Sequence, residues 1–176
     1  MLSLSPPRSL TRSSFSLILP HSFIPMSSPP PNRFVQNVDA IREAGPWGDM
    51  EWLCRPDIVA ADKLLTVRVT MPPHHCHPFH IHPHREELIY VISGQAEQWV
   101  DQDHRTLTTG DTAHIPAGMV HATYNPHDEP LVFLAILSPA NLHDDLATVE
   151  DPHDVSTEAP WSTLRADLPP CITRDE

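Results

Sequence analysis

The chain has 176 residues and 40% hydrophobic content, which is enough to bury one full core but not two. Its 21 prolines and 5 glycines argue against long helices, and no run approaches the roughly 18 apolar residues that span a bilayer. A net charge of −12 repels nucleic-acid phosphates, and 3 cysteines, an odd number, indicate no disulfide framework. We therefore expect neither a nucleic-acid partner nor a membrane partner.

Residues 1–33 are rich in serine and proline and include Arg8 and Arg12, and no acidic residue occurs before Asp39. This composition cannot bury enough apolar surface to fold, so we expect a disordered extension outside the domain. Arginine and serine without acid are also typical of an organelle transit peptide. Alternatively, the segment precedes a natural start at Met26. If there is no transit peptide, the expected location is the cytoplasm.

The next segment, residues 34–63, is expected to be an N-terminal arm that packs on the following domain. Asn37–Ala44 begins with a helix-capping residue and is followed by Gly45-Pro46, which predicts a short helix that stops there. Gly48 to Cys54 is expected to form a short strand with Trp52 facing inward.

From residue 64 to residue 138, short apolar runs, several of them alternating with polar residues, are separated by turn residues, which is typical of an all-β domain. A polar loop at 101–105 indicates a hairpin between two of these runs. The last run is continuously apolar and predicts a strand in a sheet covered on both faces. Strands are expected at 64–71, 88–92, 96–100, 106–108, 112–115, 121–124 and 131–137.

Residues 139–176 are expected to form an acidic C-terminal segment. From Asp128 to the end of the chain there are 11 acidic residues and only two arginines. Such a balance indicates a largely solvated segment. One short helix is expected near 141–146, and Trp161 is expected to pack against the barrel.

A histidine-rich run precedes the predicted strand at 88–92. His80 and His82 are two residues apart, so on an extended strand both side chains leave from the same face. A carboxylate that follows can close around the same ion. Glu86 and Glu87 are both candidates, but adjacent strand residues point to opposite faces, so only one of them can turn inward.

The other histidines of this run, His74, His75, His77 and His84, are expected at the rim or the surface. If the strand extends backward, His74 and Cys76 share the inward face with His80 and line the mouth of the site. Cys76 is otherwise a small buried filler. His114, on a later strand, is expected to be a partnered core or rim histidine.

Two spaced motifs carry a resemblance to a known family. They run His80-x-His82, four residues, Glu87, six residues, Gly94, and then Gly110, five residues, Pro116-x-Gly118, two residues, His121, three residues, Asn125. Together they resemble the cupin superfamily, and within it the small single-domain metal-binding cupins. The resemblance fails at one point, because the family's leading glycine falls at His74.

This resemblance implies a double-stranded β-helix, the jelly-roll cupin barrel, over residues 64–138, with short helical or irregular extensions at both ends. Positive φ angles are expected at Gly94 and Gly110, where tight strand connections need them. The spacing to Gly94 favours Glu87 over Glu86 as the carboxylate ligand. The implied metal ligands are His80, His82, Glu87 and His121.

Three imidazoles and one carboxylate suit a single divalent transition metal. The resemblance implies Fe, Mn, Ni, Cu, Co or Zn, and the sequence does not choose among them. An octahedral ion with four protein ligands keeps two positions open for a substrate, a water or dioxygen.

Three functions remain open at this point. The favoured one is a dioxygenase-like oxidoreductase acting on a small organic molecule. The second is a metal-dependent isomerase or decarboxylase, for which His114, His84 and Cys76 are the candidate acids or bases. The third is a non-catalytic small-molecule or metal binder, and no catalytic residue is assigned.

A homodimer is also expected, through an open strand edge at Ser93–Val100 or before Leu64.

Overall fold

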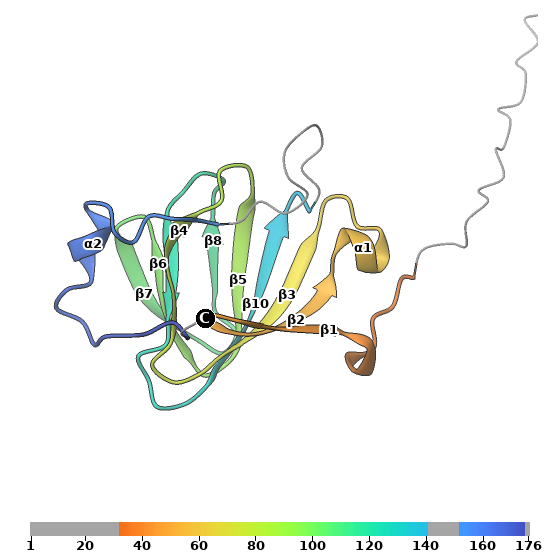
Figure 1. Ribbon diagram of the computed structural model, residues 1–176, viewed down its shortest axis with the longest axis horizontal. Helices are drawn as coiled ribbons and strands as arrows, with labels where there is room; N and C mark the ends of the chain where they lie inside the picture. The colour runs from red at the N-terminus through yellow and green to blue at the C-terminus, as the bar shows by residue number, and fades with distance from the viewer. Residues whose placement is uncertain (1–31, 141–151, 175–176) are drawn as a thin grey trace, which may run out of the picture. The chain divides into compact units, whose positions relative to one another are not determined.

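The computed structural model describes residues 32–140 and 152–174, and over these ranges the protein is built from two antiparallel β-sheets (Figure 1). This confirms the predicted all-β class and the jelly-roll architecture. Most of the predicted extension, residues 1–31, and the helix predicted near 141–146 lie outside the described residues. No helix in the described ranges is long and apolar enough to cross a membrane.

After three consecutive strands in the larger sheet, the chain crosses repeatedly between the two sheets. They are β1 (Ile41–Gly45), β2 (Gly48–Cys54), β3 (Leu65–Met71), β4 (Cys76–Ile81), β5 (Glu86–Ser93), β6 (Gln95–Val100), β7 (Asp103–Thr108), β8 (Thr112–Ile115), β9 (His121–Tyr124), β10 (Leu131–Ser138) and β11 (His153–Asp154). The larger sheet has the order β1-β2-β3-β10-β5-β8, and the smaller sheet has the order β11-β4-β9-β6-β7. The strands predicted from the sequence are all present.

The core lies between the sheets and follows the period-two alternation of β3 and β10. In β3 the odd positions from Leu65 to Met71 are buried and the even positions are half-buried. Each such apolar side chain contributes about 1.5–3 kcal/mol when it leaves water. In β10 the same alternation holds, so the prediction of a sheet covered on both faces was wrong: Leu131 and Phe133 are buried, whereas Val132 and Leu134 remain partly exposed.

The N-terminal arm differs from the predicted helix at 37–44. Only a single 3₁₀ turn forms, at Asn37–Asp39, and β1 follows it. The reason is a hairpin: Gly45 pairs with Gly48 across a two-residue turn, which places β1 alongside β2 in an antiparallel ladder. A short helix that was not predicted, α1 (Pro56–Val59), follows β2.

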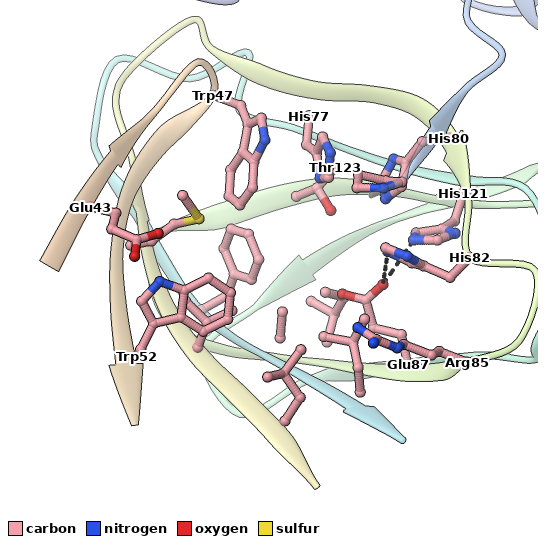
Figure 2. Close-up of a pocket in the computed structure, with 18 residues that line it drawn as sticks. Glu43, Trp47, Trp52, His77, His80, His82, Arg85, Glu87, His121 and Thr123 are labelled. Carbon is pink, nitrogen blue, oxygen red and sulfur yellow. Dashed lines mark hydrogen bonds and ion pairs between the residues drawn. The ribbon is translucent and has the colours of Figure 1, made fainter. Parts of the chain in front are cut away.

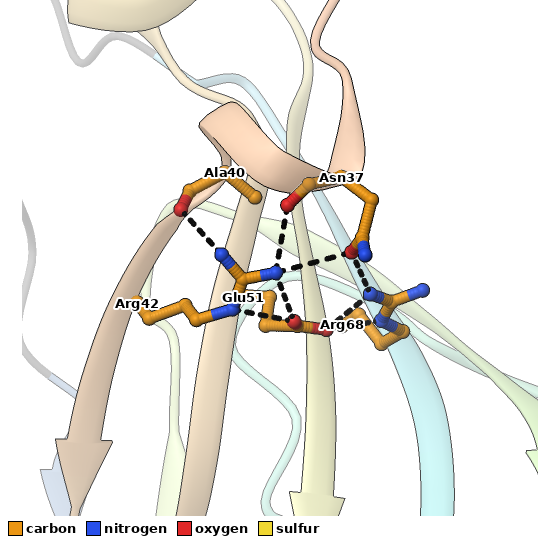
Figure 3. A network of polar contacts seen from close by, with 5 residues as sticks. All are labelled: Asn37, Ala40, Arg42, Glu51 and Arg68. Atoms are coloured by element: carbon orange, nitrogen blue, oxygen red, sulfur yellow. Dashed lines mark hydrogen bonds and ion pairs between the residues drawn. The ribbon is translucent and has the colours of Figure 1, made fainter.

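A carboxylate on β2 ties this arm to the larger sheet (Figure 3). Glu51 accepts hydrogen bonds from Arg42 of β1, at 2.9 Å, and from Arg68 of β3. Arg42 also donates to the carbonyl oxygens of Asn37 and Ala40, at 2.7 and 3.2 Å. The hydrogen bond from Arg68, and then the charges of both guanidinium groups, hold the pKa of Glu51 below its ordinary value. The carboxylate therefore stays ionised and joins three strands and the 3₁₀ turn.

The C-terminal segment is acidic, but part of it packs on the outer face of the smaller sheet. Trp161, at the start of α2 (Trp161–Leu164), has its ring centroid 5.5 Å from that of Phe79, which confirms that it packs against the barrel. Arg165 donates to both carboxylate oxygens of Glu97, at 2.6 and 2.7 Å, and its guanidinium lies 4.0 Å above the Tyr124 ring. These contacts explain why the segment is not simply solvated. The apolar residues that pack on this face are Val155, Trp161, Leu164, Leu168 and Cys171.

The sheet edges differ from those expected for a dimer. The strand β6 pairs with β7 on one side and with β9 on the other, so Ser93–Val100 offers no open edge. In the described part of the chain, β1 lies at the edge of the larger sheet, so the expected edge before Leu64 exists. The homodimer itself stays a prediction.

The motif glycines adopt the expected left-handed backbone. Gly94 and Gly110 have φ angles of +81° and +92°. His74, which stands where the family has its leading glycine, has a φ angle of +59°. This left-handed conformation favours glycine, so His74 adopts it at the cost of local strain.

Gly94 and Gly110 form a matched pair for a stability test. A Cβ atom on Gly94 would lie 2.5 Å from the carbonyl oxygen of Pro130, whereas a Cβ atom on Gly110 would meet nothing within 4 Å. We expect Gly94→Ala to lower the free energy of unfolding by about 3 kcal/mol, from strain plus the clash, and Gly110→Ala by about 1 kcal/mol, from strain alone. Urea denaturation measures both, and equal losses would contradict the close approach at Gly94.

Candidate metal centre

Four buried side chains converge at one end of the space between the sheets. His80, His82, Glu87 and His121 each present one ligand atom, and these atoms all lie within 4.8 Å of one another. They are the four residues expected from the motifs. All four are between 1% and 8% exposed, so water does not compete for their polar atoms.

The strand register explains why residues far apart in the sequence meet here. His80 of β4 lies directly opposite His121 of β9, and their ring centroids are 4.1 Å apart. His82 follows two residues later on the same face, 5.1 Å from His80 between ring centroids. Glu87 enters from β5 in the larger sheet, so the cluster joins the two sheets.

Backbone carbonyl groups set the orientation of two of the imidazole rings. Nδ1 of His80 donates to the carbonyl oxygen of Pro78 at 2.7 Å, and Nδ1 of His121 donates to that of Met119 at 3.0 Å. A neutral imidazole with its proton on Nδ1 carries a lone pair on Nε2. The Nε2 lone pairs of both rings therefore face the cluster, which is the form a metal ligand needs.

The remaining contacts of the cluster bring hydrogen-bond acceptors close together, an arrangement that a cation would stabilise. Nε2 of His121 lies 2.8 Å from Oε2 of Glu87, and Nε2 of His82 lies 3.6 Å from the same oxygen. Two acceptors at 2.8 Å repel unless a proton or a cation lies between them. Nε2 of His80 is buried and has no hydrogen-bond partner among the described residues. A divalent transition metal fits this donor set, since three imidazoles and a carboxylate would satisfy it together.

The protonation states at neutral pH also suit a metal. Burial lowers the pKa of His80 well below its ordinary value, and the nearby imidazoles of His77, His121 and His82 lower it further. Burial raises the pKa of Glu87, but its contact with His121 and the neighbouring imidazoles outweigh this, so its pKa is lowered overall. A neutral imidazole and an ionised carboxylate are the forms that bind metal.

A cavity of about 310 Å³ opens beside the cluster (Figure 2). Its volume lies at the lower end of the roughly 300–1,000 Å³ typical of small-molecule sites. Most of its wall is apolar and comes from the larger sheet and the turn between β1 and β2, whereas the smaller sheet contributes polar side chains from β4 and β9. The apolar side chains of the wall are Trp47, Met50, Trp52, Leu65, Val67, Ile89, Phe133, Ala135, Leu137 and Pro152.

Comparison with known proteins agrees with this geometry. The family model for the cupin domain matches residues 67–137, the part that contains all four clustered residues. This part of the chain is a cupin domain. The matched range also lies within the barrel predicted from the two motifs, which extends over 64–138.

Several known proteins are similar to part of this chain. Mannose-1-phosphate guanylyltransferase of Escherichia coli (strain K12) is 30% identical over 100 residues, which are 57% of this chain and 20% of that protein. Oxalate decarboxylase OxdC of Bacillus subtilis (strain 168) is 41% identical over 73 residues, 39% of this chain and 19% of that protein. The chain spans about a fifth of the length of the curated relatives it matches.

Among solved structures, an RmlC-like cupin from Shewanella frigidimarina NCIMB 400 superposes with a TM-score of 0.55. The two sequences are 20% identical, and the match covers 62% of this chain and 92% of that chain. At this identity the likeness concerns the fold alone.

One feature of this cupin corrects the prediction for the residues before His80. The pairing of β4 with β9 shifts between His77 and His80, so Pro78 and Phe79 together oppose one residue of β9. Such a β-bulge adds one residue and reverses the alternation of side chains. His77 therefore lines the cavity, whereas Cys76 faces the outer side of the sheet, packed with Phe79. The expectation that His74 and Cys76 share the inward face with His80 was wrong.

His77, expected at the rim or surface, is a wall residue of the cavity. Its ring stacks on His80, with centroids 3.7 Å apart, and on Trp47, with centroids 4.3 Å apart. Burial, as the largest influence, lowers the pKa of His77 to about 3, so it is neutral at physiological pH. Pro78 was the available signal for the bulge, because proline inside a sheet is confined to edges and bulges.

The other candidates lie away from the cavity. Glu86 is exposed and accepts from His114, with 3.1 Å between Nε2 and Oε2. His84 is exposed, and His74 contacts Asp128 at 3.1 Å on the surface. The choice of Glu87 over Glu86 as the inward carboxylate is confirmed.

Two wall residues were missed from the sequence. Trp47 lies in the turn between β1 and β2, where no local pattern indicates a cavity residue. Arg85 is only 2% exposed, although it sits among polar residues between His82 and Glu87, and it donates to the carbonyl oxygen of Ala140 at 3.4 Å. Both positions depend on long-range packing.

The tautomers of the clustered histidines can be measured directly. In metal-free protein at neutral pH we expect His80 to carry its proton on Nδ1, because Pro78 accepts it. Since its pKa lies well below the ordinary value, the ring stays neutral as the pH falls through the range where an exposed histidine titrates, near pH 6.5. Long-range ¹H–¹⁵N correlation spectra report both properties. An Nε2–H tautomer, or titration near pH 6.5, would contradict the geometry.

Proposed function

We propose that the protein binds one divalent transition metal through His80, His82, Glu87 and His121 and acts on a small organic molecule as a dioxygenase-like oxidoreductase. The observation that carries this proposal is the convergence of four buried donor atoms at the end of a largely apolar cavity. A metal at this place would have protein ligands on one side and the cavity on the other. The metal would be Fe, Mn, Ni, Cu, Co or Zn, and the oxidoreductase reaction favours a redox-active ion.

The protein's own residues would hold and orient the reacting groups. The carbonyl oxygens of Pro78 and Met119 fix two imidazole rings before any ligand arrives. The apolar wall excludes water, which strengthens electrostatic interactions inside the cavity. When bound, a divalent transition metal supplies Lewis acidity, open coordination positions and, if it is redox-active, electron transfer.

The three acid and base candidates named from the sequence give no support to an isomerase. An isomerase needs a proton donor or acceptor within reach of its substrate. His114 and His84 lie on the surface, and Cys76 lies on the far side of its sheet. None of these three lines the cavity as described.

A metal-dependent decarboxylase is the second candidate function. It is supported by the 41% identity to oxalate decarboxylase OxdC over 73 residues. Arg85 in the cavity wall would also favour a carboxylate-bearing substrate. The two candidates differ in whether dioxygen is consumed.

Adjacent carboxylates provide a controlled test of metal binding. We expect wild-type protein to bind close to one equivalent of a divalent metal after reconstitution. Glu87→Gln and His121→Ala each remove one ligand, so both should lower metal affinity by about tenfold or more. Glu86→Gln, which changes the neighbouring exposed carboxylate, should bind like wild type. Metal analysis by mass spectrometry after dialysis measures this, and wild-type protein below about a tenth of an equivalent would rule out the metal centre.

Oxygen uptake separates the two candidate reactions. With Fe-, Mn-, Ni- or Cu-reconstituted protein, we expect at least one of a panel of flavonols, diketones and thiols to stimulate oxygen consumption, measured with an electrode. The His121→Ala variant, lacking a ligand, should lose this activity. Release of carbon dioxide from a carboxylate without net oxygen uptake would instead support the decarboxylase. Ligand binding with no turnover of any kind would indicate a non-catalytic binder.

A further inference from the structure

The cavity has two chemically different ends (Figure 2). The metal-binding cluster forms one end, together with Arg85. Trp47 and Trp52 lie at the other end, near Glu43. Met50 and Phe133 also contribute to the wall, and all four apolar residues pack against the main hydrophobic core.

Trp47 is held in place by contacts from three directions. It occupies the two-residue turn between β1 and β2, where the pairing of Gly45 with Gly48 keeps the chain tightly reversed. Its indole stacks on His77 with an interplanar angle of 16°. The end of the chain clamps the same turn, because Arg174 donates from its backbone to Pro46 and from its side chain to Asp49, the latter at 2.7 Å. The ring is therefore pre-organised, which lowers the entropy cost of binding a ligand against it.

Trp52 adds a second aromatic surface and a polar atom. The guanidinium of Arg55 lies 4.9 Å from the centre of its ring. Its indole nitrogen, Nε1, is buried and has no hydrogen-bond partner among the described residues. A buried N–H group without a partner is costly, and the π face of an aromatic ligand body offers it a weak acceptor.

The charges of the wall argue against a ligand with two negative charges. Among the described residues that line the cavity, Arg85 is the one arginine and there is no lysine. Glu43 and Glu87 each contribute a carboxylate. Glu43 is paired with Arg55 at 3.3 Å, and Asp57 accepts from that arginine as well, at 2.7 Å. A phosphate or a dicarboxylate would find few cations beyond the metal itself. A single acidic head group beside the metal, followed by an uncharged body, matches this distribution.

Building on the proposed metal centre, we propose that the cavity selects a small organic acid with a single oxygen-donor head and a flat, aromatic or similarly apolar body, the body lying against Trp47 and Trp52. This ligand class differs from both the sugar phosphate and the oxalate that appear in the names of the curated relatives. Trp47 acts as a specificity residue, because it contacts the ligand body and not the head.

A matched pair of probes tests this inference. Lactate and 3-phenyllactate share the same 2-hydroxy-acid head, and only the second carries a phenyl group. Full-length protein loaded with Zn²⁺, which is redox-inert, is titrated with each by calorimetry. Burial of the phenyl group should make 3-phenyllactate bind about tenfold or more tightly than lactate, and oxalate should show no such gain.

Variants locate the effect within the cavity. Trp47→Leu should reduce the preference for 3-phenyllactate to about threefold or less, because the smaller side chain loses most of the aromatic contact, while lactate affinity and metal content stay unchanged. Trp47→Phe should keep most of the preference. Tyr90→Leu, a matched aromatic removal at a position 38% exposed on a strand of the larger sheet, should behave like wild type.

The outcomes separate this inference from the metal proposal. Equal affinity for the two acids in metal-loaded wild-type protein, or a preference unaffected by Trp47→Leu, would overturn the inference while the metal centre stands. If the protein takes up no metal, the same titrations on metal-free protein still test the preference for 3-phenyllactate over lactate. Trp47 and Trp52 are in place without the metal. If Trp47→Leu does not fold, tryptophan fluorescence of wild-type protein replaces it: a change on adding 3-phenyllactate but not lactate supports the inference, and no change overturns it.

Discussion

The structure depends on a set of lone pairs that the protein buries but does not satisfy. His80 and His121 each use their one N–H group on a backbone carbonyl, so their remaining ring nitrogens face Glu87 and each other. Burying such acceptors together without a proton or a cation is costly. The cluster is therefore destabilising on its own and favourable with a metal. This is the behaviour expected of four residues that could hold a metal ion.

The rest of the fold holds these atoms in position. The bulge at Pro78–Phe79 adds one residue to β4, and this single residue decides which side chains face the cavity. It turns His77 and His80 inward together and sends Phe79 to the outer face. The C-terminal segment then covers that outer face, and Asp154 of β11 pairs with His80. The strand β4, which carries His80 and is followed by His82, is thus covered on its outer face and paired along both edges, with β9 and with β11.

The four clustered residues could be predicted because they depend on local spacing. His80 and His82 share a face by simple alternation, and the second motif supplies His121 at a regular distance from its turn. The strands in the middle of the chain could be predicted for the same reason, since buried and half-buried side chains alternate along consecutive residues of β3.

The features that the sequence did not reveal depend on contacts between distant segments. A helix pattern at 37–44 was overridden because pairing with β2 stabilises a strand there. Trp47 lies at a hairpin tip that stacks on His77 and is hydrogen-bonded to Arg174, far along the chain. The many acidic residues after Asp128 led to the prediction of a solvated segment. A charge count ignores the apolar residues spaced among them, and these, including Trp161 and Leu164, pack on the smaller sheet. Only the bulge had a local signal, Pro78, and the signal does not say in which direction the register shifts.

Anomalous diffraction from crystals of metal-reconstituted protein tests the central claim most directly. We expect one anomalous peak, bonded to three imidazole nitrogens and one oxygen of Glu87 at about 2.0–2.2 Å, with the open side of the ion facing the apolar cavity. No peak in the barrel, or a peak held instead by surface histidines such as His74 and His84, would contradict it.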